Sequence, residues 1–219
     1  MMARRGALGL LAGSIAGLLG GCGWLFKSGS YRFRMTVEVE TPEGVRTGSS
    51  VYEAMASKSP ALTSQEHEGS GGLRGEAVVV DLPGGPLFVT LKMPVAGETL
   101  DGAATLALAP DTRRGDVDAY VAAVDRLGGT VGAKAELPRK DWPLMVRFGD
   151  LGDPASAQEV NPDAIGVKRI VLETTGDAVT TGIEKWLAWL SAAENFHYNG
   201  TAYGDLYPLP VDAFRSGLR

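Results

Sequence analysis

The sequence of 219 residues contains one cysteine, Cys22, and two histidines, His67 and His197. A single cysteine cannot form a disulfide within the chain, and it cannot build a zinc site from several thiolates. Neither histidine stands in a His-Glu-x-x-His pattern or in another metal-binding spacing. We therefore expect no disulfide, no metal centre and no other cofactor in this protein.

Motifs for common enzymatic chemistry are also missing. The sequence has no Gly-x-Ser-x-Gly elbow, and Ser49-Ser50 lie inside a predicted strand with no histidine or aspartate close to them in the sequence. The glycines of residues 69–72 are not followed by a lysine and a helix, as a phosphate-binding loop requires. We interpret His67 as a solvated loop residue and His197 as a packed or turn residue. No catalytic residue is predicted.

Clusters of basic residues are absent after Arg5. The formal net charge is −5, and removal of Arg4 and Arg5 with an N-terminal signal would lower it to −7. Nucleic-acid binding depends on clustered Lys and Arg that contact phosphates, so this class of partner is not expected. The chain is 44% hydrophobic and 21% charged, which is the balance of a globular protein. Its length fits one globular domain, predicted over residues 31–219.

The N-terminal residues have the pattern of an export signal. The first five residues are cationic, and residues 6–21 carry no charge and are rich in Leu, Ala and Gly. The segment Leu19-Gly20-Gly21-Cys22 then resembles the lipobox of bacterial lipoproteins, in which a branched apolar residue and two small residues precede the modified cysteine. The resemblance implies a signal peptide over residues 1–21, a lipidated Cys22, and a short tether over residues 22–30.

Other interpretations of this segment compete with lipidation. Residues 6–26 are just long enough to span a bilayer as an uncleaved anchor, although their glycines weaken a helix. Cys22 could also be an ordinary small residue after a secretory signal, or the chain could stay in the cytoplasm. The lipoprotein interpretation is favoured and predicts a body in the cell envelope, facing the periplasm, held to the membrane by acyl chains such as palmitate. Gly23 is not an aspartate, which slightly favours the outer over the inner membrane.

Hydrophobic alternation predicts antiparallel strands in the first half of the chain. Apolar residues occupy every second position of residues 31–40, which is the period of a half-buried strand. Residues 41–44 read as a turn that leads into a second strand over 45–56. Residues 57–75 are polar and glycine-rich and are predicted to be a loop. Further strands are predicted over residues 76–82, 87–93 and 103–109.

The second half adds helices to the predicted sheet. Asp116 is a candidate N-cap, and apolar residues follow it at helical spacing, which predicts a helix over 116–127. Thr181 and Glu184 have the spacing of a capping box, which predicts a second helix over 181–192. The apolar stripe of that helix, expected to be buried against the sheet, consists of Ile183, Trp186, Leu187 and Leu190. With strands at 144–148 and 168–174, the expected fold is α+β: a mainly antiparallel meander with two amphipathic helices in the C-terminal half.

Two segments of the second half are candidate sites with structural alternatives. Asp150 and Asp153 follow a predicted strand on a glycine-bearing loop, where carboxylates can bind a hard cation, but Asp and Gly are also ordinary turn residues. The turn interpretation is favoured. Aromatic residues gather near the C-terminal end and are predicted to cover the core rather than to form an exposed recognition surface. They are Phe196, Tyr198, Tyr203, Tyr207 and Phe214.

Part of the body resembles certain uncharacterised bacterial proteins. The resemblance rests on residues 32–53, with their Val-Glu-Val-Glu-Thr-Pro-Glu-Gly core, on Arg147-Phe148-Gly149-Asp150 and on Gly182-Ile183-Glu184-Lys185. It implies no activity, cofactor or site residue. The sequence is therefore consistent with two classes of function. The favoured one is a non-catalytic envelope lipoprotein that binds a ligand or partner or has a structural role, and the other is a hydrolase-type or metal-dependent enzyme whose site is assembled from scattered residues.

Overall fold

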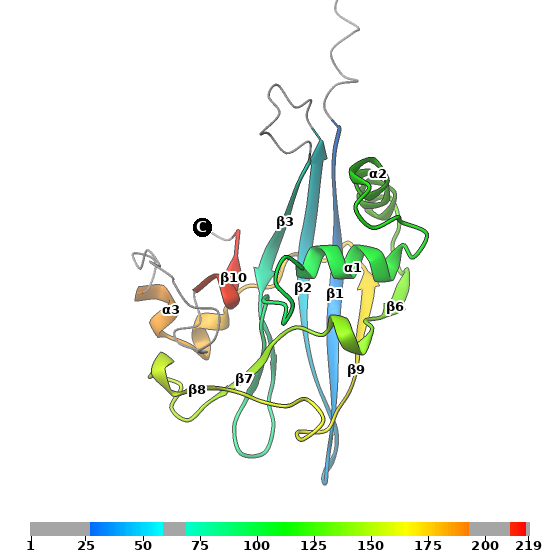
Figure 1. The fold of residues 1–219 in the computed structure, drawn as a ribbon. Coiled ribbons are helices and arrows are strands. Elements are labelled where there is room, and N and C mark those ends of the chain that lie inside the picture. Colours follow the sequence, from blue (N-terminus) through cyan, green and yellow to red (C-terminus); the bar gives the residue numbers. More distant parts are fainter. Residues whose placement is uncertain (1–26, 59–68, 193–210, 218–219) are drawn as a thin grey trace, which may run out of the picture.

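The computed structural model describes residues 27–58, 69–192 and 211–217. These residues form an α+β fold with ten strands in two antiparallel sheets and three α-helices (Figure 1). The sheet-dominated α+β class predicted from the sequence is confirmed. None of the helices in these ranges is long and apolar enough to cross a membrane.

The larger sheet has the strand order β10-β3-β2-β1-β9-β6. Its strands are β1 (Lys27–Thr41), β2 (Gly44–Lys58), β3 (Gly69–Glu76), β6 (Lys134–Glu136), β9 (Val167–Thr174) and β10 (Arg215–Ser216). The smaller sheet has the order β4-β5-β7-β8. Its strands are β4 (Val78–Val80), β5 (Leu87–Val89), β7 (Met145–Phe148) and β8 (Ala157–Glu159).

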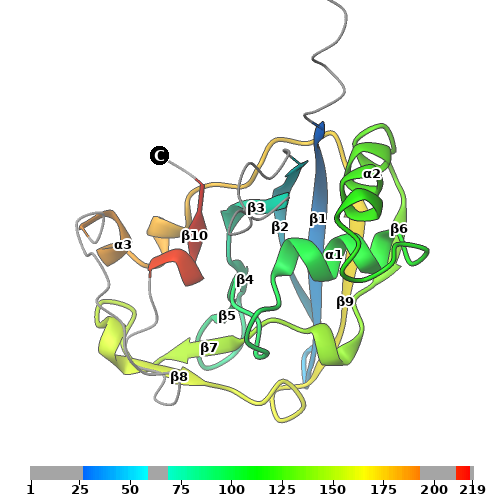
Figure 2. The ribbon, with the colours of Figure 1, turned by 45° about the horizontal axis from the view of Figure 1, so that its top comes forward.

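The described helices are short, and all of them follow β5 in the chain. The α-helices are α1 (Leu100–Leu108), α2 (Val117–Gly128) and α3 (Trp189–Ala192). Single turns of 3₁₀ helix are η1 (Arg139–Asp141), η2 (Pro154–Ser156), η3 (Ile183–Lys185) and η5 (Val211–Ala213). In both views α1 crosses in front of β1 and β9, and α2 lies beside the upper end of β1, while α3 and β10 lie apart from them (Figures 1 and 2).

The hairpin of β1 and β2 forms the centre of the larger sheet, and its register runs from Lys27 opposite Lys58 to Thr41 opposite Gly44. The alternation predicted for residues 31–40 is confirmed, because every second side chain is buried in the main core. These side chains are Tyr31, Phe33, Met35, Val37 and Val39. The turn at 41–44 is also confirmed. The strand begins at Lys27, however, so part of the segment predicted as a tether is already ordered sheet.

Helix α2 packs closely on β1. Asp116 caps the helix as predicted, because its carboxylate accepts a hydrogen bond from the N–H of Ala119 at 3.0 Å. A side chain at Gly128 would place its Cβ 2.5 Å from the carbonyl oxygen of Ser30. Glycine therefore lets the backbones of the helix and the strand approach each other more closely than any other residue would.

Several predicted boundaries are wrong. Residues 103–108 belong to helix α1 and Ala109 is its C-cap, so this segment is not a strand. The Ala- and Leu-rich run after the N-cap Thr99 forms helical hydrogen bonds instead. The predicted loop over 57–75 is wrong where the structure describes it: β2 continues to Lys58 and β3 starts at Gly69. The predicted strand over 76–82 is divided between β3 and β4, and the one over 87–93 ends at Val89.

The helix predicted over 181–192 is also wrong. The segment forms only η3 and the short α3, and its capping residue is Gly182, with a φ of 110° and no side-chain hydrogen bond. Thr181 and Glu184 therefore do not form a capping box. Trp186, predicted to be buried, is 37% exposed. The other three residues of the predicted stripe are buried in a second apolar cluster, which contains Phe88, Val146, Ile183, Leu187, Leu190 and Phe214.

Candidate functional site

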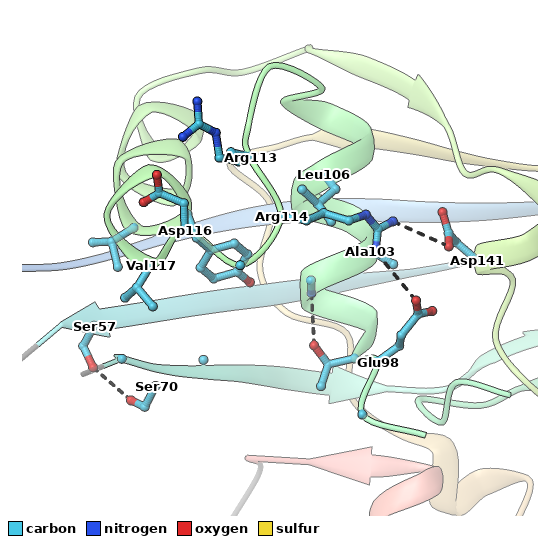
Figure 3. Close-up of a pocket in the computed structure, with 18 residues that line it drawn as sticks. Ser57, Ser70, Glu98, Ala103, Leu106, Arg113, Arg114, Asp116, Val117 and Asp141 are labelled. Carbon is cyan, nitrogen blue, oxygen red and sulfur yellow. Dashed lines mark hydrogen bonds and ion pairs between the residues drawn. The ribbon is translucent and has the colours of Figure 1, made fainter. Parts of the chain in front are cut away.

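The candidate site is a cleft of about 340 Å³ between helices α1 and α2 and the adjoining ends of β2 and β3. Figure 3 shows Ala103 and Leu106 on α1 and Val117 at the start of α2, with Ser57 and Ser70 on the two strands. A volume of this size lies near the lower end of the range of roughly 300–1,000 Å³ that is usual for small-molecule sites. The cleft could therefore hold only a small ligand.

Glycines of β3 form one side of the cleft. A Cβ at Gly69 would lie 2.5 Å from Cγ1 of Val117, and a Cβ at Gly71 would lie 3.0 Å from Oδ2 of Asp101. Both positions turn toward the helices. Larger residues here would collide with α2 or occupy the space beside α1, so the glycine-rich sequence of β3 is a condition for the cleft.

A chain of buried polar groups lies beside the cleft. Asp101, which is 6% exposed, accepts a hydrogen bond from the hydroxyl of Tyr120 at 3.1 Å. The Thr105 hydroxyl donates to the carbonyl oxygen of Asp101 at 2.8 Å and lies 3.0 Å from the hydroxyl of Tyr31. Burial raises the pKa of both tyrosines, and the charge of Asp101 adds to the effect at Tyr120. Both hydroxyls are therefore protonated at neutral pH, and Tyr120 acts as a hydrogen-bond donor.

Two arginines follow each other in the loop between α1 and α2. The guanidinium of Arg114 extends across α1, where it lies 3.6 Å from Glu98 and 3.9 Å from the buried carboxylate of Asp141 (Figure 3). Arg113 points in a different direction, beside the start of α2, and is exposed. Arg113 forms no ion pair with any of the residues that the structure describes.

A shallower hollow continues outward from the cleft. It shares with the cleft the loop residues from Arg113 to Val117 and adds Lys58 and Asp118. The ammonium of Lys58 lies 2.7 Å from the carboxylate of Asp118, whose pKa is lowered by this hydrogen bond. The site thus has an inner part with apolar walls and an outer part with charged residues.

The structure assigns structural roles to three of the residues singled out in the sequence. Asp150 accepts the N–H of Gly152 and Asp153 accepts the N–H of Ala155, each at 2.8 Å, which confirms the turn interpretation. In the part of the chain that the structure describes, no group of three or more potential metal ligands occurs. The hydroxyl of Ser50 donates to the carbonyl oxygen of Glu76 at 2.8 Å, within the core.

Other predicted site residues lie outside the described ranges. These are Cys22, His67, His197, Phe196, Tyr198, Tyr203 and Tyr207. Phe214 is described and is fully buried, which agrees with the prediction that it covers the core. Sequence reasoning missed the cleft itself. A signal was present, because glycines at 69 and 71 alternate on one face of β3 and Arg113-Arg114 is a cationic pair between two helices, but nothing in the sequence joins these segments.

These features define a sheet-dominated α+β domain with a small cleft between the helices and one end of its larger sheet. Comparison of the chain with protein-family models, with curated proteins and with solved structures finds no match in any of the three.

Proposed function

We propose that this chain is an exported lipoprotein, attached to the membrane through Cys22, whose α+β body binds a small ligand without catalysing a reaction. The observation that carries the proposal is the position of the lipobox-like segment. Cys22 stands at the end of an uncharged run and five residues before the first residue of β1. Five residues span at most about 18 Å, so the attached body would lie close to the bilayer, in the cell envelope and facing the periplasm.

The state of the charged groups supports a binding role over a catalytic one. The carboxylate of Asp116 caps α2, Arg114 lies between two carboxylates, and Asp101 accepts the hydroxyl of Tyr120. These groups stabilise the walls of the cleft. A general base or a nucleophile would need an activating partner and access to a substrate.

Acylation of Cys22 tests the anchor. The full chain is expressed in a bacterial host that is fed an alkyne-bearing palmitate analogue, and the membrane fraction is examined by mass spectrometry of the N-terminal peptide. We expect the mature chain to start at an acylated Cys22, and we expect Cys22→Ser to lose the label. An intact Met1, or a processed chain with an unmodified N-terminus elsewhere, would overturn the proposal. Outer-membrane location is then tested by separating the two membranes on a density gradient.

A further inference from the structure

We propose that the cleft binds a single-chain amphiphile with an anionic head group, taken from the membrane to which the chain is attached. The membrane as the source of this ligand rests on the proposed function above. The chemistry of the cleft does not, because it depends only on the described residues of the body.

The inner part of the cleft is suited to an apolar tail. Ala103 and Leu106 of α1 lie on one side, and Val117 and Val121 of α2 lie on the other. The backbone of β3 closes the cleft at Gly69 and Gly71, which add no side chains of their own. A volume of about 340 Å³ limits the tail to one short or medium-length acyl chain and excludes a lipid with two long chains.

The outer part of the cleft is suited to an anion. Its acidic groups are engaged, because Asp116 caps the helix and Asp118 pairs with Lys58. Arg114 is flanked by the carboxylates of Glu98 and Asp141. Among the described residues, Arg113 is a rim cation with no ion pair. Its guanidinium can donate two parallel hydrogen bonds to a carboxylate or a phosphate. An amphiphile whose tail enters between α1 and α2 would leave its head beside this arginine.

The cleft lies at the end of the sheet where the chain enters from the membrane anchor. Lys27 pairs with Lys58, and Lys58 pairs with Gly69, so the first residue of β1 and the glycine side of the cleft share one row of the sheet. Neighbouring strands are about 4.8 Å apart, which places Gly69 roughly 10 Å from the start of β1. Figure 1 shows α2 near this end of β1. The cleft would therefore be held close to the head groups of the bilayer.

Photo-crosslinking of the full chain tests the binding chemistry. The chain is purified from membranes, reconstituted in phosphatidylcholine nanodiscs and exposed to a diazirine derivative of decanoate. We expect the label on peptides that contain Leu106 and Val117, and competition by decanoate but not by butyrate, which lacks the tail. Label spread over the surface, or label that butyrate displaces equally well, would overturn the proposal.

Two matched pairs of variants identify the groups involved. Leu106→Trp fills the inner cleft and should reduce labelling about tenfold, whereas Val45→Trp, at an exposed site in the far hairpin, should not change it. Arg113→Ala should weaken the binding of decanoate by at least about tenfold, since even one lost hydrogen bond to a charged group has this effect, while Arg46→Ala should have no effect. The binding of decanol, whose head group is uncharged, should not change with Arg113→Ala. Since Arg113 is exposed, Arg113→Ala keeps the proposal testable if Leu106→Trp fails to fold. Equal effects of Arg113→Ala and Arg46→Ala on decanoate binding would overturn the proposal.

The source of the ligand is tested in the same nanodiscs. Monoacyl phosphatidylglycerol incorporated into the disc should displace the probe from the acylated chain. Failure to displace it, together with normal decanoate labelling, would show that the cleft takes its ligand from solution and would overturn the membrane source. Acylation of Cys22 is measured independently, so a chain that is not acylated but still binds decanoate would contradict the proposed anchor and leave the chemistry of the cleft standing.

Discussion

The buried carboxylate of Glu76 accepts a hydrogen bond from the backbone N–H of Ile183 at 2.8 Å, across 107 positions of the chain. Glu76 is the last residue of β3 and is only 3% exposed. Nearby, the N–H of Thr180 donates to the carbonyl oxygen of Val51, and the Thr180 hydroxyl accepts the N–H of Val51. These contacts fasten the segment after β9 to the sheet and place η3 over the second apolar cluster.

Burial raises the pKa of the Glu76 carboxyl, an effect that the hydrogen bond from Ile183 opposes and the charge of Glu184 reinforces. Because the folded state then binds this proton more tightly than the unfolded chain, its contribution to stability is greatest below the ordinary value of 4.5 and falls as the pH rises through the raised pKa. We expect Glu76→Gln to flatten the decline of unfolding free energy above that pH. Urea melts of both proteins across the acid range measure the difference.

Glu76→Ala separates the charge from the hydrogen bond. A glutamine can still accept the N–H of Ile183, whereas an alanine leaves that buried donor without a partner, at a cost of about 1–3 kcal/mol. We expect the alanine variant to be destabilised at every pH. If glutamine and alanine behave alike, the hydrogen bond between Glu76 and Ile183 contributes nothing measurable.

The exposures of Trp186 and Leu187 predict opposite sensitivities to truncation. Leu187 is fully buried in the second apolar cluster, and Leu→Ala at such sites costs about 2–5 kcal/mol. Trp186 is 37% exposed, so its removal leaves a smaller cavity. We expect Leu187→Ala to lower the denaturation midpoint more than Trp186→Ala does, although tryptophan is the larger residue. The reverse order would mean that Trp186 belongs to the core, as its spacing in the sequence suggests.

The sequence was informative where one local signal determined the structure. Alternation over residues 31–40 sufficed for β1 because one face of that strand is buried along most of its length. Asp116 and the apolar spacing after it sufficed for α2. The helix predicted over residues 181–192 was wrong because the backbone there is held by distant groups, among them Glu76, and because Gly182 adopts a left-handed conformation. The helical spacing of apolar residues in this segment indicated most of the buried side chains, but it did not indicate the backbone conformation.

The cleft could not be predicted for a related reason. Its walls come from β2, β3, α1 and α2, which are separate in the sequence, and its cavity depends on glycines that read locally as loop residues. Paired β-structure around Gly69 and Gly71 became evident only with the register of β3 on β2. Function is still less accessible, because the charged residues of the cleft form no pattern along the chain.

Gly69 is expected to be intolerant of even a methyl group. A Cβ there would lie 2.5 Å from Cγ1 of Val117, so Gly69→Ala must shift the Val117 side chain or the backbone of α2 or β3 that holds the two residues together. Overpacking of this kind costs about 1–3 kcal/mol. Gly84→Ala is not a suitable control because its φ is positive, whereas Gly176→Ala has open space around the added carbon. Thermal melts should show a clear loss of stability for the first variant and little change for Gly176→Ala.

A double-mutant cycle on Asp101 and Tyr120 measures how strongly the polar chain beside the cleft is coupled. The hydroxyl of Tyr120 donates a hydrogen bond to Oδ2 of Asp101 at 3.1 Å. Tyr120→Phe removes that donor and leaves a buried carboxylate poorly solvated, while Asp101→Asn removes the charge that Tyr120 stabilises.

Hydrogen bonds to charged groups contribute about 1.5–3 kcal/mol. We expect a coupling energy within that range from urea denaturation of the wild type, the two single variants and the double variant, since contacting residues are not additive. Thr130→Val with Asp101→Asn provides a reference pair, because the Thr130 hydroxyl donates to the carbonyl oxygen of Arg126 and has no described contact with Asp101. The effects of these two substitutions should be additive. Additivity of Tyr120→Phe and Asp101→Asn would mean that the carboxylate is solvated from the cleft, and the polar chain would then play no part in holding α1 against α2.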